Sequence, residues 1–269
     1  MSTNLHTLLS IAGSDPVGGA GIQADIRSGN LLGVHVMTAI TAITAQNSHK
    51  VKEVFFIPSK LLKDQLDSVI EDVMPDSIKI GLIGSEENFL IISDFLKSLP
   101  SNVKVVIDPV IKASSDGRLM INLKDIKKII SLYINYLFPF STVITPNLYE
   151  LKMFSDNVSD LCSKEILEHL HANSIVLTGG HSQDMIVTDT LITSDGISKF
   201  SHPRYNCHNL HGTGCTYSSI LASFLALGNG LKKAVSLTSS KISEIISRSC
   251  DYSLGSSIYG PLNINYYTI

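Results

Sequence analysis

The sequence predicts an α/β fold in which helices cover both faces of a mostly parallel sheet. Short apolar segments rich in β-branched residues alternate with segments of helical periodicity along nearly the whole chain. The chain has 269 residues, 44% of them hydrophobic, and neither a flexible linker nor a fixed-period repeat interrupts it. Strands separated by helices of this length form parallel sheets. We therefore expect a single domain over residues 1–269.

The first half of the chain opens with a strand, a glycine-rich loop and a helix. Four glycines in the loop Gly13–Gly21 mark a turn, and the apolar spacing that follows it is helical. The elements expected in this half are strand Thr7–Ala12, helix Ile22–Leu32, strands Val36–Ala45 and Val54–Ile57, helix Lys60–Val73, strand Ser77–Ile83, helix Glu86–Leu99 and strand Val103–Ile107.

The second half continues the alternation and adds a hairpin. A Ser-Asp-Gly turn at 194–196 separates its two strands. The expected elements are helix Leu123–Leu137, strand Thr142–Thr145, helices Tyr149–Phe154 and Lys164–Ala172, strand Ser174–Thr178, strands Ile186–Ile192 and Ile197–Phe200, and helices Cys215–Leu227 and Leu231–Cys250. Ligands of open sheets bind beyond the carboxyl ends of the strands, so the segments after strands are where we expect functional residues.

Composition excludes several classes of partner. The net charge is −3 and the Lys and Arg residues are scattered, so we expect no nucleic acid. No stretch approaches the roughly 18 apolar residues of a membrane span, and no secretory leader is recognisable, so we expect a cytoplasmic protein without a membrane partner. No C-x-x-C spacing indicates zinc, and we expect the four cysteines to be free thiols: Cys162, Cys207, Cys215 and Cys250.

The strongest local signal is the stretch Gly212-Thr213-Gly214-Cys215 at the start of a predicted helix. Two glycines let backbone N–H groups converge where the helix end carries partial positive charge, which makes a hole for an anion such as a phosphoryl group. We expect the helix end to lower the pKa of Cys215, so that its thiolate could take a proton from a substrate hydroxyl. An ordinary turn and a packed thiol are the structural alternatives.

A second signal lies in the loop after the first strand and in the helix that follows it. The loop has neither the Gly-Lys-Ser/Thr of a phosphate loop nor the Gly-x-Gly-x-x-Gly of a dinucleotide site. It could instead let the backbone approach a small flat ligand, with Asp25 accepting hydrogen bonds from it. Gln46 offers a donor and an acceptor that could match the edge of a heterocycle. The alternatives are a turn-forming Asp15, a solvated Asp25 and a surface glutamine.

Two carboxylates follow neighbouring predicted strands. Asp108 comes after Val103–Ile107, and Glu150 follows the next strand along the chain. They could hold Mg²⁺ through water while it bridges ATP phosphates, although a helix cap or a solvated charge is the alternative for each. The histidines, including His181 and His211, lack metal-ligand spacing, and we expect them to be structural.

These residues together resemble the hydroxymethylpyrimidine/phosphomethylpyrimidine kinases of thiamine biosynthesis, a branch of the ribokinase-like superfamily. The resemblance runs in order along essentially the whole chain, to Gly260–Asn263. It rests on the segments Ile11–Asp25, Thr41–Asn47, Lys79–Gly81, Asp108–Val110, Ile144–Asn147, Gly179–His181 and His211–Thr216.

The resemblance implies a three-layer α/β/α sandwich, commonly a homodimer. It implies phosphorylation of 4-amino-5-hydroxymethyl-2-methylpyrimidine and then of its monophosphate, both from ATP with Mg²⁺. By position, it assigns the pyrimidine to Gly13, Asp25, Gln46 and Val110, and the anion hole and base to Gly212, Thr213, Gly214 and Cys215. We expect the nucleotide at Asn147, Thr178 and Gly180, and the metal at Asp108 and Glu150.

The chain departs from the family pattern on the phosphate side. The family usually has Lys-Gly-Gly-His, whereas Thr178 precedes Gly179 here, so an expected cation is missing and the second transfer could suffer. The loop after Val110 also differs, with Lys112 as a replacement charge or a solvated lysine, and Ser256-Ser257 stand where glycine is usual. Two other functions remain open, a pyridoxal or pyridoxine kinase and a non-catalytic pyrimidine-binding regulatory protein.

Overall fold

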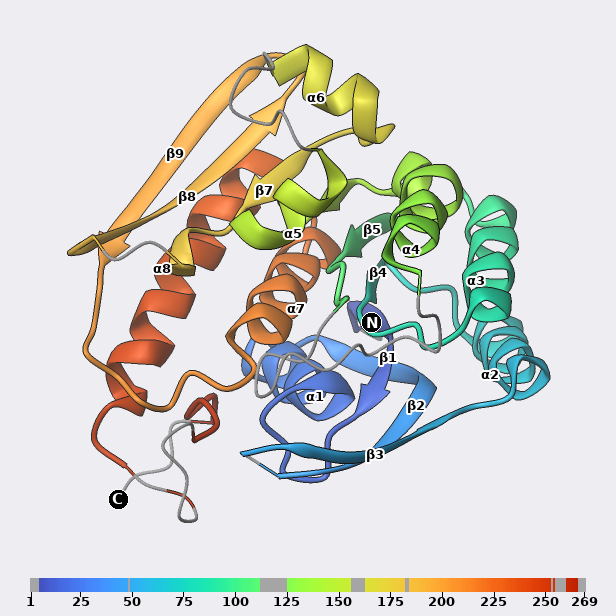
Figure 1. Ribbon diagram of the computed structural model, residues 1–269, viewed down its shortest axis with the longest axis horizontal. Coiled ribbons are helices and arrows are strands. Elements are labelled where there is room, and N and C mark those ends of the chain that lie inside the picture. Colours follow the sequence, from blue (N-terminus) through green and yellow to red (C-terminus); the bar gives the residue numbers. More distant parts are fainter. Residues whose placement is uncertain are drawn as a thin grey trace, which may run out of the picture.

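The computed structural model describes residues 5–47, 49–111, 125–155, 163–181, 184–252, 254 and 260–265. Nine strands of these residues form one sheet, in the order β3-β2-β1-β4-β5-β6-β7-β8-β9 (Figure 1). Their bounds are β1 Thr7–Ser14, β2 His35–Gln46, β3 Val51–Phe56, β4 Ser77–Ile80, β5 Lys104–Ile107, β6 Val143–Ile144, β7 Ile175–Leu177, β8 Ile186–Thr193 and β9 Gly196–Pro203.

The middle of the sheet is parallel and its two edges are antiparallel. Strands β2, β1, β4, β5, β6 and β7 run in one direction, while β3 pairs antiparallel with β2. At the other edge β7, β8 and β9 pair antiparallel, and the hairpin turns just before Gly196, which has a φ of 125°. The prediction of a mostly parallel sheet is therefore confirmed, and the carboxyl ends of its central strands meet along one edge.

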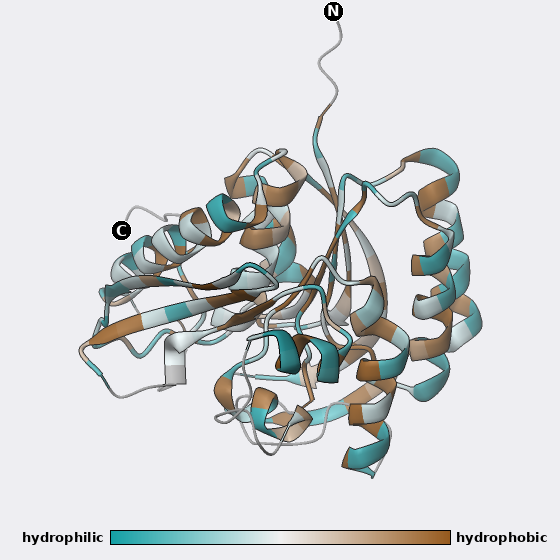
Figure 2. Cartoon of the chain, turned by 90° about the horizontal axis from the view of Figure 1, so that it is seen from above, coloured by the Kyte–Doolittle hydropathy of each residue, from teal (hydrophilic) through white to brown (hydrophobic). Residues whose placement is uncertain are grey.

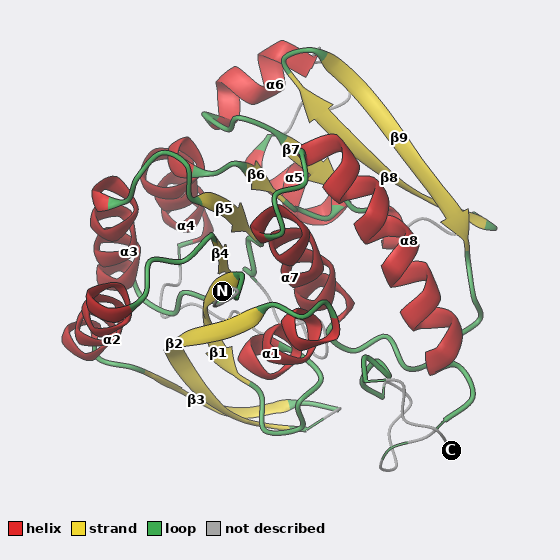
Figure 3. Cartoon of the chain, turned by 180° about the vertical axis from the view of Figure 1, so that it is seen from behind, coloured by secondary structure: helices red, strands yellow, loops and turns green. Residues whose placement is uncertain are grey.

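Helices cover both faces of the sheet. On one face lie α1 (Gly21–Leu31), α7 (Thr213–Ala226) and α8 (Leu231–Ser249), side by side in Figure 3. The other face is covered by α2 (Ser59–Asp72), α3 (Glu86–Ser98), α4 (Ile126–Leu132), α5 (Leu148–Phe154) and α6 (Ser163–Leu170). Each face has its own apolar core, and Figure 2 shows the hydrophobic strands between helices with hydrophilic outer surfaces. This is the three-layer arrangement that the resemblance implied.

Alternation along the buried strands explains the two cores. Leu8 packs in the core of the α7 face, whereas Leu9 packs in the core of the α3 face. Successive side chains of a strand point to opposite faces, so a strand buried on both sides is apolar throughout. Lys79 breaks this pattern in β4, since it lies between the core residues Ile78 and Ile80 and is nevertheless fully buried.

Most predicted boundaries agree with the structure to within three residues. The largest difference is the predicted helix Leu123–Leu137. Its first two residues lie outside the described residues, α4 begins at Ile126, and the last turn is the π-helical segment η1 (Tyr133–Leu137), followed by the short 3₁₀ helix η2 (Phe138–Phe140). The Tyr133 ring packs edge-on against Phe89 and Phe154 at this point. Among the helices of the described residues, none has the length and apolar composition needed to cross a bilayer.

Candidate active site

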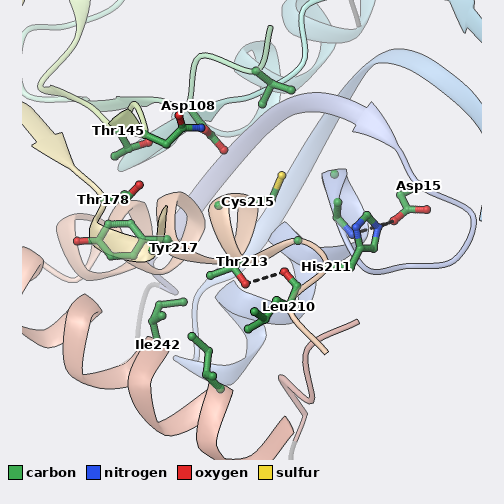
Figure 4. A pocket seen from close by; sticks show the side chains of 18 of the residues that line it. Asp15, Asp108, Thr145, Thr178, Leu210, His211, Thr213, Cys215, Tyr217 and Ile242 are labelled. Atoms are coloured by element: carbon green, nitrogen blue, oxygen red, sulfur yellow. Dashed lines mark hydrogen bonds and ion pairs between the residues drawn. The ribbon is translucent and has the colours of Figure 1, made fainter. Parts of the chain in front are cut away.

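A cavity of about 470 Å³ opens at the carboxyl ends of the central strands and at the N-terminus of α7. In Figure 4 the Cys215 thiol lies in the middle of the view, with Asp15 and His211 on one side and Thr178 and Tyr217 on the other. The cavity brings together nearly all candidate residues of the sequence: Gly13, Gln46, Asp108, Val110, Asn147, Glu150, Thr178, Gly180, Gly212, Thr213, Gly214 and Cys215. Asp25 is the exception.

The start of α7 is shaped by Gly212. Its φ of 84° lies in the left-handed region, and a Cβ added there would collide with the carbonyl oxygen of Gly19. Only glycine fits this approach of the two loops. Thr213 closes the turn, since its hydroxyl and its N–H both donate to the Leu210 carbonyl, at 2.7 and 3.2 Å.

The first turn of α7 leaves N–H groups for an anion. The Thr216 N–H donates to the Gly212 carbonyl at 2.9 Å, but within the described part of the chain no acceptor is found for the N–H groups of Gly214 and Cys215. Two such donors beside the positive end of a 14-residue helix are able to bind an anion. The geometry expected of an anion hole is present.

Asp15 joins the glycine-rich loop to the anion hole. Its carboxylate accepts hydrogen bonds from the N–H groups of Val17, Gly19 and Ala20, and lies 3.0 Å from Nε2 of His211. Burial alone would raise the pKa of Asp15, but hydrogen bonds from His211 and Gln46 outweigh it and lower the pKa to about 2. Asp15 is therefore more than the turn former that the sequence indicated, and His211 lines the cavity.

Asp25 lies beneath the cavity and does not line it. Its side chain is fully buried, and its oxygens accept hydrogen bonds from Ser10, Ser219 and the ammonium of Lys79. The expectation that Asp25 binds the substrate directly does not fit this place, because both oxygens are already engaged. Sequence reasoning assigned no role to Lys79, although a lysine within an apolar strand is a signal that could have singled it out.

The prediction of a lowered pKa for Cys215 is wrong for this structure. Burial raises the pKa of the thiol to about 12, against the opposing charge of Lys79, while the carboxylates of Asp108 and Asp25 raise it further. The effects of burial and of the surrounding carboxylates on the thiol pKa therefore outweigh the effect of the helix end. At neutral pH the thiol is mainly protonated, and any base chemistry depends on the positive charges close to it.

Asp108 and Glu150 both line the cavity, and Asp108 lies close enough to affect the pKa of Glu150. Burial and the neighbouring Asp108 raise the pKa of Glu150 to about 8, and burial raises that of Asp108 against the charge of Lys79. Two neighbouring carboxylates repel each other when both are ionised, and such a pair suits a divalent cation held through water. Among the described residues no group of three or more His, Cys, Asp or Glu side chains is placed to hold a metal.

The remaining wall is formed by the segment between β7 and β9. Thr178 and Gly180 line it, and the carboxylate of Asp189 holds the N–H of Gly179 at 3.0 Å. Arg204, which the sequence did not single out, also lines the cavity, and its guanidinium donates to the carbonyl oxygens of Asp184 and Gly180. The structure therefore has a cation near the position where Thr178 replaces the usual lysine. Lys112, Cys162 and Ser256-Ser257 lie outside the described residues.

The fold and the cavity define a small-molecule phosphotransferase of ribokinase-like architecture. The chain belongs to the phosphomethylpyrimidine kinase family, whose model matches residues 15–263. A hydroxymethylpyrimidine/phosphomethylpyrimidine kinase of Haemophilus influenzae is 35% identical over 97% of this chain and 97% of its own length. The thiamine biosynthesis bifunctional protein ThiED of Geobacter sulfurreducens is 35% identical over 96% of this chain and 52% of its own.

Among solved structures, the chain is similar to a pyridoxal kinase of Bacillus subtilis in complex with ADP. The two superpose with a TM-score of 0.83 at 28% identity, and 98% of each chain is covered. A pyridoxal kinase therefore shares the fold of this chain, so the fold alone does not determine the substrate.

Proposed function

We propose that this protein phosphorylates the hydroxyl of 4-amino-5-hydroxymethyl-2-methylpyrimidine and then the resulting monophosphate, using ATP, in thiamine biosynthesis. The family model and the Haemophilus influenzae relative support this substrate. The observation that carries the proposal is the cavity itself, which combines the free N–H groups at the start of α7 with the amide of Gln46. One end suits a phosphoryl group and the other suits the edge of a heterocycle.

At the pyrimidine end, Gly13, Gln46 and Val110 would contact the substrate. A Cβ at Gly13 would lie 2.6 Å from the Leu82 side chain, so glycine keeps this part of the wall open. Gln46 contributes to the lowered pKa of Asp15, and because the ionised carboxylate of Asp15 can only accept hydrogen bonds, the amide NH2 of Gln46 would be the group that faces it. This orientation leaves the Gln46 carbonyl oxygen for a donor such as an exocyclic amino group.

At the phosphoryl end, the N–H groups of Gly214 and Cys215 would bind the oxygens of the transferred group. In its thiolate form, which is the minor form at neutral pH, Cys215 would take the proton of the substrate hydroxyl as that oxygen attacks the γ-phosphorus. Phosphoryl transfer through a loose transition state needs little proton removal, so a thiol of high pKa is compatible with the reaction. We expect Cys215→Ala to retain partial activity.

The nucleotide would lie along Asn147, Thr178 and Gly180, in the part of the cavity next to β7 and β8. The ADP complex of the similar pyridoxal kinase supports a nucleotide on this fold. Asp108 and Glu150 would hold Mg²⁺ through water, and the bound ion would neutralise the phosphate oxygens as charge develops on them.

A homodimer fits the exposed ribbon at the edge of the sheet. Ile43 of β2 and Phe55 of β3 are paired across the strands, and each side chain is at least half exposed. A self-complementary contact between two such ribbons would bury this pair, as the two-fold symmetry of most dimers allows. Sedimentation of the purified protein tests the proposal, and a monomer at all concentrations would contradict it.

The function is tested by measuring ADP release with two substrates. With MgATP, we expect a kcat/KM for hydroxymethylpyrimidine at least about tenfold above that for pyridoxal, because a hydrogen-bonding site rejects a ligand that leaves its groups unpaired. Omission of Mg²⁺ should abolish the reaction. Turnover of pyridoxal alone would establish the pyridoxal kinase alternative, and pyrimidine binding without ADP release would establish the regulatory one.

A further inference from the structure

An ion pair between Lys79 and Asp25 is buried directly beneath the cavity. The ammonium of Lys79 lies 3.0 Å from each carboxylate oxygen of Asp25, and both side chains are completely inaccessible to solvent. Ser10 of β1 and Ser219 of α7 donate to the same carboxylate. Asp25 is thus fixed by three elements, and through it the position of the Lys79 charge is fixed as well.

Stability alone does not account for this pair. Removing two charges from water costs several kcal/mol each, and apolar residues of similar volume are usually at least as stabilising as a buried ion pair. The neighbours of Lys79 in β4, Ile78 and Ile80, show that this strand otherwise packs by apolar contacts. A charge pair that is neutral or costly for folding points to an electrostatic role near the cavity.

The surroundings of Lys79 indicate where its charge acts. Its side chain reaches the cavity wall, and its charge interacts with Cys215 and Asp108 as well as with Asp25. A lysine ammonium has three N–H donors, of which two are used by Asp25. For the third, no acceptor exists within the described ranges of the chain. Lys79, and not Asp25, therefore borders the cavity, with a positive charge and a third donor for which the described residues supply no acceptor.

We propose that Lys79 is a positioning residue for phosphoryl transfer, whose charge, anchored by Asp25, stabilises the thiolate of Cys215 and the negative charge that develops on the acceptor oxygen. For the reaction itself, this rests on the proposed function. In the step concerned, the proton of the substrate hydroxyl passes to the thiolate, the oxygen forms a bond to the γ-phosphorus, and the bond to ADP breaks with its electron pair going to ADP. The excess negative charge stays near the anion hole throughout.

The other charged groups that face Cys215 oppose Lys79. Asp25 and Asp108 both disfavour a thiolate, and Lys79 is the cation that counteracts them in the structure. The backbone of Gly21 also lowers the pKa of the thiol. Removing Lys79 and Asp25 together takes away the charge of Lys79, which favours the thiolate strongly, and that of Asp25, which disfavours it more weakly. The thiolate therefore becomes less stable.

The inference is tested by the rate at which iodoacetamide alkylates Cys215, measured at pH 9 without substrate and localised by peptide mass spectrometry. In the double variant Lys79→Met/Asp25→Asn we expect alkylation to be about tenfold slower, which corresponds to a rise of one pKa unit. A role limited to packing predicts the opposite, because a loosened site exposes the thiol and speeds alkylation. An unchanged or faster rate in the folded variant would overturn the proposal.

A second pair of substitutions and a matched control make the result decisive. Lys79→Gln/Asp25→Asn removes the same charges but keeps hydrogen-bonding side chains, and it is used if the first variant does not fold. Asp189→Asn changes another buried carboxylate of the same cavity, which bonds the Gly179 N–H and Ser239, and should leave the alkylation rate unchanged.

Kinetics with substrate then separate this inference from the proposed function. We expect the charge-free pair to lower kcat at least about tenfold while the KM for the pyrimidine stays within about threefold, because the effect arises in the transition state. An equal kcat would contradict the proposal. If the wild type phosphorylates pyridoxal instead, the proposed function fails, but the alkylation result still decides the role of Lys79.

Discussion

Nε2 of His211 lies 3.0 Å from Oδ2 of Asp15, and this contact joins two segments that are 196 residues apart in the sequence. His211 directly precedes the anion hole, whereas Asp15 organises the glycine-rich loop after β1 through three backbone N–H groups. Gln46 also contributes to the lowered pKa of Asp15, so this carboxylate links the proposed pyrimidine end of the cavity with the proposed phosphoryl end. In the proposed reaction, the relative placement of the two substrates would depend on the contact between His211 and Asp15.

Asp15 should make the folded state sensitive to acid. Its pKa is lowered from 3.8 to about 2 in the folded protein, so its contribution to stability is present above about pH 4 and is lost as the pH falls through 2. We expect a loss of about 2 kcal/mol from this group. Urea unfolding of the wild type and of Asp15→Asn at pH 6 and pH 2.5 checks it, and an equal pH dependence in both proteins would contradict the prediction.

Replacement of Gly212 by alanine should disrupt the anion hole. The added Cβ would meet the Gly19 carbonyl and would also force a left-handed backbone on alanine, which alone costs about 1 kcal/mol or more. We expect a lower melting temperature and a kcat reduced by about a hundredfold, as for the loss of an oxyanion donor. Gly230→Ala is the matched control, since Gly230 has a φ of −64° and no atom within 4 Å of an added Cβ. Equal effects of the two changes would show that the shape of this turn does not matter.

Substitution of Thr178 by lysine should restore the cation that the family pattern leads us to expect. Thr178 lines the cavity and is only partly buried, so a longer side chain can extend toward the phosphates. We expect the KM for ATP to fall several-fold and the proportion of diphosphate product to rise. Nucleotide titration and mass analysis of the products provide the measurement. No change in either would show that Arg204 or another group already supplies the charge.

The fold was predictable because its signals are local. Strand and helix periodicity placed β1, α3 and the β8–β9 hairpin correctly, and the glycines at 212 and 214 marked the start of α7. The described residues form a sheet of nine strands, and local patterns could not predict the order of the strands in it. That order depends on contacts between segments that are distant in the sequence. The π-helical end of the fourth helical region likewise reflects tertiary packing around Tyr133.

The site was predictable in its residues but not in its electrostatics. Sequence position indicated Gly212–Cys215, Gln46 and Asp108, and the structure brings them to one cavity. Sequence position could not show that the Asp25 side chain is turned toward Lys79, because its direction depends on which face of α1 packs against β4 and α7. For the same reason, the sequence overstates how far the helix end lowers the pKa of Cys215. In the structure that pKa follows burial and the surrounding carboxylates.

Transfer of a phosphoryl group from ATP to the hydroxyl of an aminopyrimidine is the reaction we expect in this cavity. The decisive measurement is mass spectrometry of the products formed from hydroxymethylpyrimidine and MgATP. With the wild-type protein we expect the pyrimidine monophosphate, followed by the diphosphate, and with Gly212→Ala we expect neither within the same time. Unchanged pyrimidine after prolonged incubation with the wild type, or equal yields from both proteins, would refute this reaction for the cavity.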